Sequence, residues 1–255
     1  MSLPTKRNDV LSQEPSVLIV YGPPKVGKTS ALAQLENALF LDCEQPPGTS
    51  YVSCMSVPIS SFKQFIATCA EIVKEGCKYD YVIVDTIDAL ERMCIAEANI
   101  RYKLSNICPK DYKGSNILTD LALGSGYTWL WDCVRDVLDA VCKTSKRIII
   151  VGHLKEKLLK DTMATENSEG ADLDLTGKVK NIVCARADAI GLLKRKVRPG
   201  IVPPKADLYI NFRCTDETNC GIRIERLAGK EFLFASVEDK QAKWEEIYPS
   251  ITNKK

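Results

Sequence analysis

A glycine-rich stretch near the start of the chain constrains the fold most strongly: residues 22–29 read GPPKVGKT. Five β-prone residues precede it (VLIVY, residues 17–21), and a helix-prone run follows it (SALAQLEN, residues 30–37). A strand, a glycine loop and a helix in this order are typical of a phosphate-binding loop. Gly22 and Gly27 permit backbone angles and a close approach that a Cβ atom would prevent. The stretch therefore predicts a site for a nucleoside triphosphate.

The residues of this loop have distinct expected roles. The backbone N–H groups and the helix N-terminus point at a polyphosphate, Lys28 reaches the β- and γ-phosphates, and the Thr29 hydroxyl ligates Mg²⁺. Asp85 ends the apolar run YVIVD (residues 81–85), where a carboxylate can hold the Mg²⁺ shell; capping of the next helix is the alternative. The predicted metal ligands are thus Thr29 and Asp85. The predicted nucleotide-binding residues are Gly22, Pro23, Pro24, Lys25, Val26, Gly27, Lys28, Thr29, Ser30 and Asp85.

Composition narrows the class of protein. The chain has 255 residues, of which 45% are hydrophobic and 27% charged, as expected for one large α/β domain. The net charge is only +2, so a nucleic-acid site would have to be a local patch. No apolar run approaches the roughly 18 to 20 residues of a membrane span, and the N-terminus lacks the apolar segment of a secretory signal. Eleven cysteines without a C-x-x-C pair indicate reduced cytoplasmic thiols, with a metal site as the alternative.

The order of apolar runs predicts a mainly parallel sheet flanked by helices. Strands are expected at residues 17–21, 38–42, 51–55, 81–85 and 147–152, and helices at 30–37, 59–75, 89–102 and 129–142. Residues 105–126 and 154–178 are expected to be loops. Four runs near the end are too closely spaced for crossover helices and predict an antiparallel extension, at residues 189–193, 207–212, 221–225 and 231–234. The expected organisation is a tail at 1–14, one domain at 15–236 and a C-terminal tail at 237–255.

Two further strand ends carry candidate catalytic groups. Glu44 closes the run LFLDCE (residues 39–44), and strand ends in such sheets face the ligand, so Glu44 is the predicted general base. Asp42 is the rival, and a surface carboxylate is the alternative. His153 follows the run IIIVG (residues 148–152), where it can contact the γ-phosphate and report its loss. As the single histidine, His153 could also be an incidental strand-end residue.

Together these strand ends resemble the RecA core, in which a strand-end glutamate activates water and a polar residue after a later strand senses the γ-phosphate. The matching segments are FLDCE (40–44), VIVDT (82–86) and IIVGH (149–153). RecA usually has glutamine at the sensor position, where this chain has histidine. Many AAA+ ATPases carry the catalytic glutamate directly after the magnesium aspartate, but Thr86 stands there in this chain. Within the superfamily the chain most resembles small single-domain RecA-like ATPases of phages, with GSGY (124–127) and LAGK (227–230) as further matches.

The resemblance implies an ATPase that uses ATP and Mg²⁺ and acts on single-stranded DNA in phage recombination or replication, in the host cytoplasm. It also implies a homo-oligomeric ring or filament, in which a neighbouring subunit donates a cation, and a single-strand-binding protein as a possible partner. Arg226 and Lys230 match that cation, and Lys194, Arg195 and Lys196 form a second basic cluster; solvated strand edges are the alternative. No Asn-Lys-x-Asp guanine motif is present, which favours ATP.

The resemblance to RecA-like cores also implies DNA contact through two loops, residues 105–127 and 154–178. The first carries Lys110, Tyr112, Lys113 and Tyr127, and the second begins with Lys155, Lys157 and Lys160. Lysines neutralise phosphates and tyrosines stack on bases, although such charges are often only a solvated face. Two other functions stay open: a helicase-like subunit of a ring, and a nucleotide-gated scaffold with little turnover. A small-molecule kinase is disfavoured, because no lid or acceptor pocket can be identified.

Overall fold

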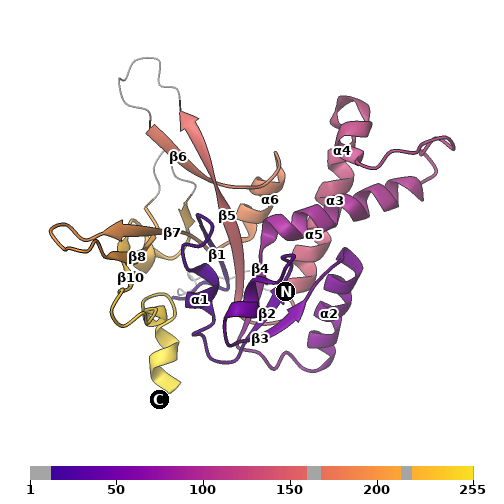
Figure 1. Ribbon diagram of the computed structural model, residues 1–255. Coiled ribbons are helices and arrows are strands. Elements are labelled where there is room, and N and C mark those ends of the chain that lie inside the picture. Colours follow the sequence, from indigo (N-terminus) through magenta and orange to yellow (C-terminus); the bar gives the residue numbers. More distant parts are fainter. Residues whose placement is uncertain (1–12, 160–167, 214–219, 255) are drawn as a thin grey trace, which may run out of the picture.

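The computed structural model describes residues 13–159, 168–213 and 220–254, in which ten strands form one mixed sheet (Figure 1). The strands are β1 Val17–Gly22, β2 Ala38–Asp42, β3 Met55–Pro58, β4 Tyr81–Asp85, β5 Ile148–Leu159, β6 Ser168–Leu173, β7 Ala189–Val197, β8 Ala206–Asn211, β9 Gly221–Ile222 and β10 Glu231–Ala235. The helices are α1 Lys28–Leu32, α2 Phe62–Lys74, α3 Ile87–Lys103, α4 Ile117–Asp120, α5 Gly126–Val141 and α6 Val179–Arg186.

The sheet order is β10-β8-β7-β1-β5-β4-β2-β3, with β6 paired to β5 and β9 to β7. The six strands from β7 to β3 are parallel to one another, whereas β8, β10, β6 and β9 pair antiparallel. The strand before the glycine loop, β1, is thus central, and β5 separates it from β4. This arrangement matches the predicted parallel sheet, and it brings the carboxyl ends of β1, β2, β4 and β5 to one edge.

Alternating side chains divide the core into two layers. On one face, Ile19, Val84 and Ile150 pack with α2, α3, α5 and α6. On the other, Val20 and Ile83 pack with α1 and the end of the chain. The cysteines of the described residues are free thiols, of which four are buried in the core layer with α2, α3 and α5: Cys43, Cys69, Cys94 and Cys133. Among the described residues, none of the helices is long and apolar enough to cross a membrane.

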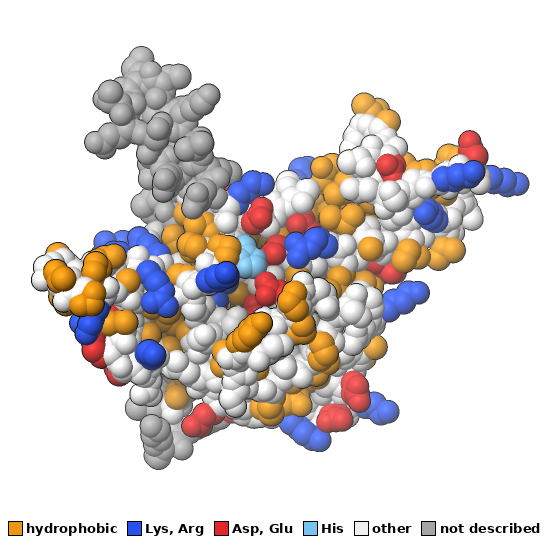
Figure 2. Space-filling view, in the orientation of Figure 1, with side chains coloured by type: hydrophobic (Ala, Val, Ile, Leu, Met, Phe, Trp, Pro, Cys, Tyr) orange, Lys and Arg blue, Asp and Glu red, His pale blue; other side chains and the backbone are white. Residues whose placement is uncertain are grey.

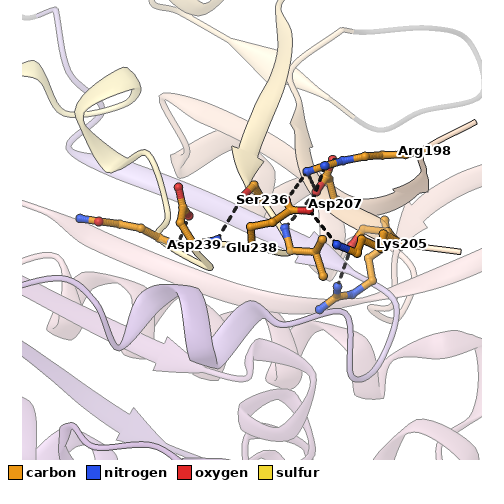
Figure 3. A network of polar contacts seen from close by, with 10 residues as sticks. Arg198, Lys205, Asp207, Ser236, Glu238 and Asp239 are labelled. Carbon is orange, nitrogen blue, oxygen red and sulfur yellow. Dashed lines mark hydrogen bonds and ion pairs between the residues drawn. The ribbon is translucent and has the colours of Figure 1, made fainter. Parts of the chain in front are cut away.

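The segment after residue 236 packs on the second layer. Trp244, Ile247 and Tyr248 are buried, and the Trp244 Nε1–H donates to the carbonyl of Ala31 at 2.9 Å. A polar network connects this segment to the end of β7, as Figure 3 shows. There Arg198 donates to both Asp207 carboxylate oxygens, at 2.5 and 2.8 Å, and to Glu238 at 2.6 and 3.0 Å. The last residues therefore support the helix α1 that follows the glycine loop.

Several local predictions were wrong. Helix α1 ends at Leu32, short of residue 37, because the chain must turn into β2 at Ala38. The strand expected at 51–55 begins instead at Met55, where pairing with β2 starts. Residues 154–178 are not one loop: β5 continues to Leu159 and pairs with β6 in a hairpin that extends beyond the sheet in Figure 1. Lys160 and the rest of 160–167 lie outside the described residues, as do residues 1–12 of the predicted tail.

The predicted antiparallel extension is correct only in part. Strand β7 is parallel to β1, since α6 supplies the crossover that the sequence pattern did not indicate. Strands β8 and β10 then pair antiparallel as expected. Helix α6 has little amphipathic character, with only Val179 and Val183 buried, so its apolar stripe is too narrow to stand out.

Candidate active site

The strand register brings the predicted functional residues to one edge of the sheet. Gly22 is opposite His153 across β1 and β5, and Asp42 is opposite Asp85 across β2 and β4. Figure 2 shows the single histidine at the centre of this face, surrounded by acidic and basic side chains. Polar groups thus converge at the carboxyl ends of parallel strands, where ligands of open α/β sheets bind.

The glycine loop sits tightly between its neighbours. A Cβ atom on Gly22 would lie 2.5 Å from the backbone oxygen of Leu193, and Gly27 has a φ of +110°, so both positions require glycine. Lys28 is buried, and its Nζ donates to the carbonyls of Gly22 and Pro23 at 3.0 Å each. Burial lowers the pKa of Lys28, while the negative charges of three nearby carboxylates oppose that shift.

Thr29 and Asp85 meet as expected for two ligands of one cation. The Thr29 Oγ1 donates to Asp85 Oδ2 at 2.9 Å. Burial raises the pKa of Asp85 to about 6, with further raising from Glu44 and Asp42, against the opposing Thr29 hydrogen bond and the Lys28 charge. A hydroxyl and a carboxylate are the oxygen ligands that Mg²⁺ accepts. The described residues hold no cluster of three or more His, Cys, Asp or Glu suited to a metal.

The structure distinguishes the two candidate bases, Asp42 and Glu44. Asp42 is buried, and its carboxylate accepts from the Glu44 N–H at 3.1 Å and from the Thr49 N–H and hydroxyl at 2.9 and 2.7 Å. It therefore holds the turn that follows β2. The Glu44 side chain is 31% exposed at the same edge. A Cβ atom on Gly48 would lie 2.8 Å from Glu44 Oε2, so the glycine leaves room for this carboxylate.

Sequence reasoning missed Asp88, which lies in the first turn of α3. Both Asp88 oxygens are 3.1 Å from His153 Nδ1, and His153 Nε2 is 3.8 Å from Glu44 Oε1. The hydrogen bond and charge of Asp88 raise the pKa of His153, against burial and the Lys28 charge. The only signal in the sequence was an acidic residue one turn after the strand-end Asp85, and such residues are common at helix starts.

The basic candidates lie in different places. Arg226 donates to the carbonyls of Gln13, Glu246 and Ile247, at 2.5 to 3.3 Å, and so connects the segment before β1 with the segment after β10. The Lys230 side chain is exposed. A role for either cation in a neighbouring subunit stays a prediction.

The second basic cluster is divided between the two faces of β7. Lys194 and Lys196 both pair with Glu231, at 3.2 and 2.7 Å. The side chain between them, Arg195, lies against the glycine loop and donates from Nε to the Val26 carbonyl at 3.1 Å. Alternation along the strand thus places one cation of the three beside the glycine loop.

Comparison with known proteins agrees with this geometry. A family model described as an AAA domain matches residues 14–223. The chain belongs to this family. The predicted α/β core, a mainly parallel sheet flanked by helices, is confirmed for this AAA domain. A search of curated proteins finds no match. Among solved structures, the crystal structure of the RadB recombinase is similar at a TM-score of 0.38 and 15% identity, over 76% of this chain and 81% of that one.

Proposed function

We propose that this AAA domain binds ATP with Mg²⁺, hydrolyses it, and acts on single-stranded DNA. The observation that carries the proposal is the convergence of the glycine loop, the Thr29–Asp85 pair, Glu44 and His153 at one sheet edge. Each group matches a part that phosphoryl transfer needs: a phosphate cradle, metal ligands, a base and a donor near the terminal phosphate. The reduced thiols favour a cytoplasmic setting.

In the proposed reaction, Glu44 accepts a proton from a water molecule as the water oxygen bonds to the γ-phosphorus. The bond from that phosphorus to the β–γ bridging oxygen breaks, and its electron pair leaves with ADP. Lys28 exchanges its carbonyl partners for phosphate oxygens and offsets their charge. Thr29 and Asp85 would hold Mg²⁺, which supplies further charge neutralisation when bound.

Glu44→Gln tests the hydrolysis proposal. The variant should lose turnover by about 10²-fold or more, the range for a general base, while nucleotide affinity stays near wild type. Lys28→Ala should instead lose nucleotide binding. Glu71→Gln, an exposed carboxylate on α2, is the control. Unchanged turnover in Glu44→Gln would show that the base is another group. If the wild-type protein binds nucleotide but does not hydrolyse it, the function would instead be that of a nucleotide-gated scaffold.

The DNA part of the proposal rests on a few lysines. Lys110 and Lys113 are exposed in the segment between α3 and α4. Tyr112 is already engaged, because its hydroxyl contacts Asn99 at 3.1 Å and Asp120 at 3.2 Å. We therefore assign phosphate contact to the lysines rather than base stacking to this tyrosine.

Single-stranded DNA should accelerate ATP hydrolysis, and its affinity should fall as salt rises. A Lys110→Ala/Lys113→Ala double variant should weaken both effects. The matched control is Lys143→Ala/Lys146→Ala, with the same spacing and both side chains exposed before β5. If neither double variant changes the stimulation by DNA, the DNA site lies elsewhere on the protein. If DNA does not stimulate ATP hydrolysis at all, the DNA role is excluded.

Assembly is the remaining part of the proposal: a homo-oligomeric ring or filament in which Arg226 or Lys230 serves the neighbouring nucleotide, with a single-strand-binding protein as a partner. Arg226 would first have to release its carbonyl partners. Mixing a Lys28→Ala chain with an Arg226→Ala or a Lys230→Ala chain tests this, because activity restored in the mixture requires a cation donated between subunits.

A further inference from the structure

Asp88 and His153 form a pair that the hydrolysis steps above leave unexplained. Asp88 comes from the first turn of α3 and His153 from β5, 65 residues apart in sequence. The Asp88 side chain is only 13% exposed, and both of its oxygens lie 3.1 Å from the same ring nitrogen, Nδ1. Such symmetric contact leaves little freedom for the ring to rotate.

The other ring nitrogen is directed into the candidate active site. His153 Nε2 lies 3.8 Å from Glu44 Oε1, on the opposite side of the ring from Asp88. Because an ionised carboxylate only accepts hydrogen bonds, Nδ1 must carry the proton in this arrangement. A neutral ring would then expose an acceptor at Nε2, whereas a protonated ring exposes a donor.

The charged groups around the ring decide between these forms. Asp88 from α3 and Glu44 from the turn after β2 favour the protonated ring, whereas Lys28 from α1 and burial disfavour it. Arg92 lies behind Asp88, with its Nη1 3.8 Å from Oδ2. The Asp88 hydrogen bond is the largest of these influences, so the pKa of His153 lies above its ordinary value.

We propose that Asp88 is a positioning residue, which holds the His153 ring with its Nε2–H toward the terminal phosphate of the bound nucleotide. This inference rests on the proposed ATPase function. A protonated His153 then places a positive charge from the same subunit near the phosphate on which negative charge develops. Loss of the terminal phosphate would leave that donor facing Glu44 alone.

The single histidine makes a direct test possible. In protein without a histidine tag, the imidazole ¹⁵N and ¹H NMR signals all come from His153. We expect a wild-type pKa above 6.5 and a proton on Nδ1 in the neutral form. Asp88→Asn should lower that pKa, because it removes the charge and the hydrogen bond that raise it, and Asp88→Glu should restore part of the difference. Asp132→Asn, at an exposed aspartate on α5, should leave both readouts unchanged.

Hydrolysis gives the second readout. Asp88→Asn should lower kcat about tenfold with little change in KM, and should move the high-pH limb of the kcat profile to lower pH. The inference would be overturned if the wild-type His153 ring has a pKa at or below 6.5 and carries its proton on Nε2. This measurement needs no variant, so it decides the question even if Asp88→Asn cannot be purified folded. An unshifted ring in folded Asp88→Asn would overturn the inference too. If the wild type does not hydrolyse ATP, the proposed function fails, but the NMR result still decides the role of Asp88.

Discussion

Asp85→Asn should stabilise the nucleotide-free protein near neutral pH, although it removes a predicted Mg²⁺ ligand. Asp85 is 2% exposed, and burial raises its pKa from 3.8 to about 6. At about 1.36 kcal/mol for each pKa unit, ionised Asp85 costs the folded state about 3 kcal/mol. Asparagine has nearly the same shape, carries no charge and can still accept the Thr29 hydrogen bond.

The pH dependence follows from the sign of the shift. Below pH 3.8 the carboxyl is protonated in both folded and unfolded chains, so it contributes no difference. As pH rises towards 6, the unfolded chain releases the proton first, and the destabilisation is complete above about pH 6. The free energy of unfolding of the variant should therefore exceed that of wild type by about 3 kcal/mol at pH 7.5. At pH 4 the two free energies should be nearly equal.

Urea unfolding in EDTA, at several values between pH 4 and 8, measures this difference. Asp132→Asn, an exposed aspartate paired with Arg135, controls for loss of charge alone. Adding ATP and Mg²⁺ should stabilise wild type much more than Asp85→Asn, because the variant lacks a predicted metal ligand. Equal stabilities at pH 7.5, or a difference that does not change with pH, would refute the reasoning.

Two other substitutions test contacts around the glycine loop. Arg195→Ala should raise the dissociation constant of a fluorescent ATP analogue about tenfold, as expected for a lost charge-assisted contact, because Arg195 lies against Val26. Lys196→Ala, which loses its ion pair with Glu231 and its contact with the Tyr209 ring, should leave that constant unchanged. Equal effects of the two substitutions would argue against a local role for Arg195. Trp244→Phe should lower the unfolding free energy by about 1–2 kcal/mol in urea, since it removes the bond to Ala31; an unchanged midpoint would contradict that.

Much of the site could be predicted because its signals are local. The loop from Gly22 to Thr29 is contiguous, and the apolar runs before Asp85 and His153 have the length of buried strands. In a parallel sheet the ends of such strands meet at one edge, so the approach of Asp85 to Thr29 followed from pattern alone. The fold class and the meeting of Thr29 with Asp85 therefore required no knowledge of long-range contacts.

The sequence by itself thus determined an α/β protein with a glycine loop after its first strand and acidic strand ends. Only the tertiary structure decided which partners these polar groups have. Asp42 accepts hydrogen bonds from Thr49, Glu44 lies 3.8 Å from His153, and Asp88 contacts the other nitrogen of the same ring. The tertiary structure also decided that Arg195 faces the loop. The reason is physical, since the availability of a lone pair or a charge depends on partners that are remote in sequence, and residue types and local periodicity do not record those partners.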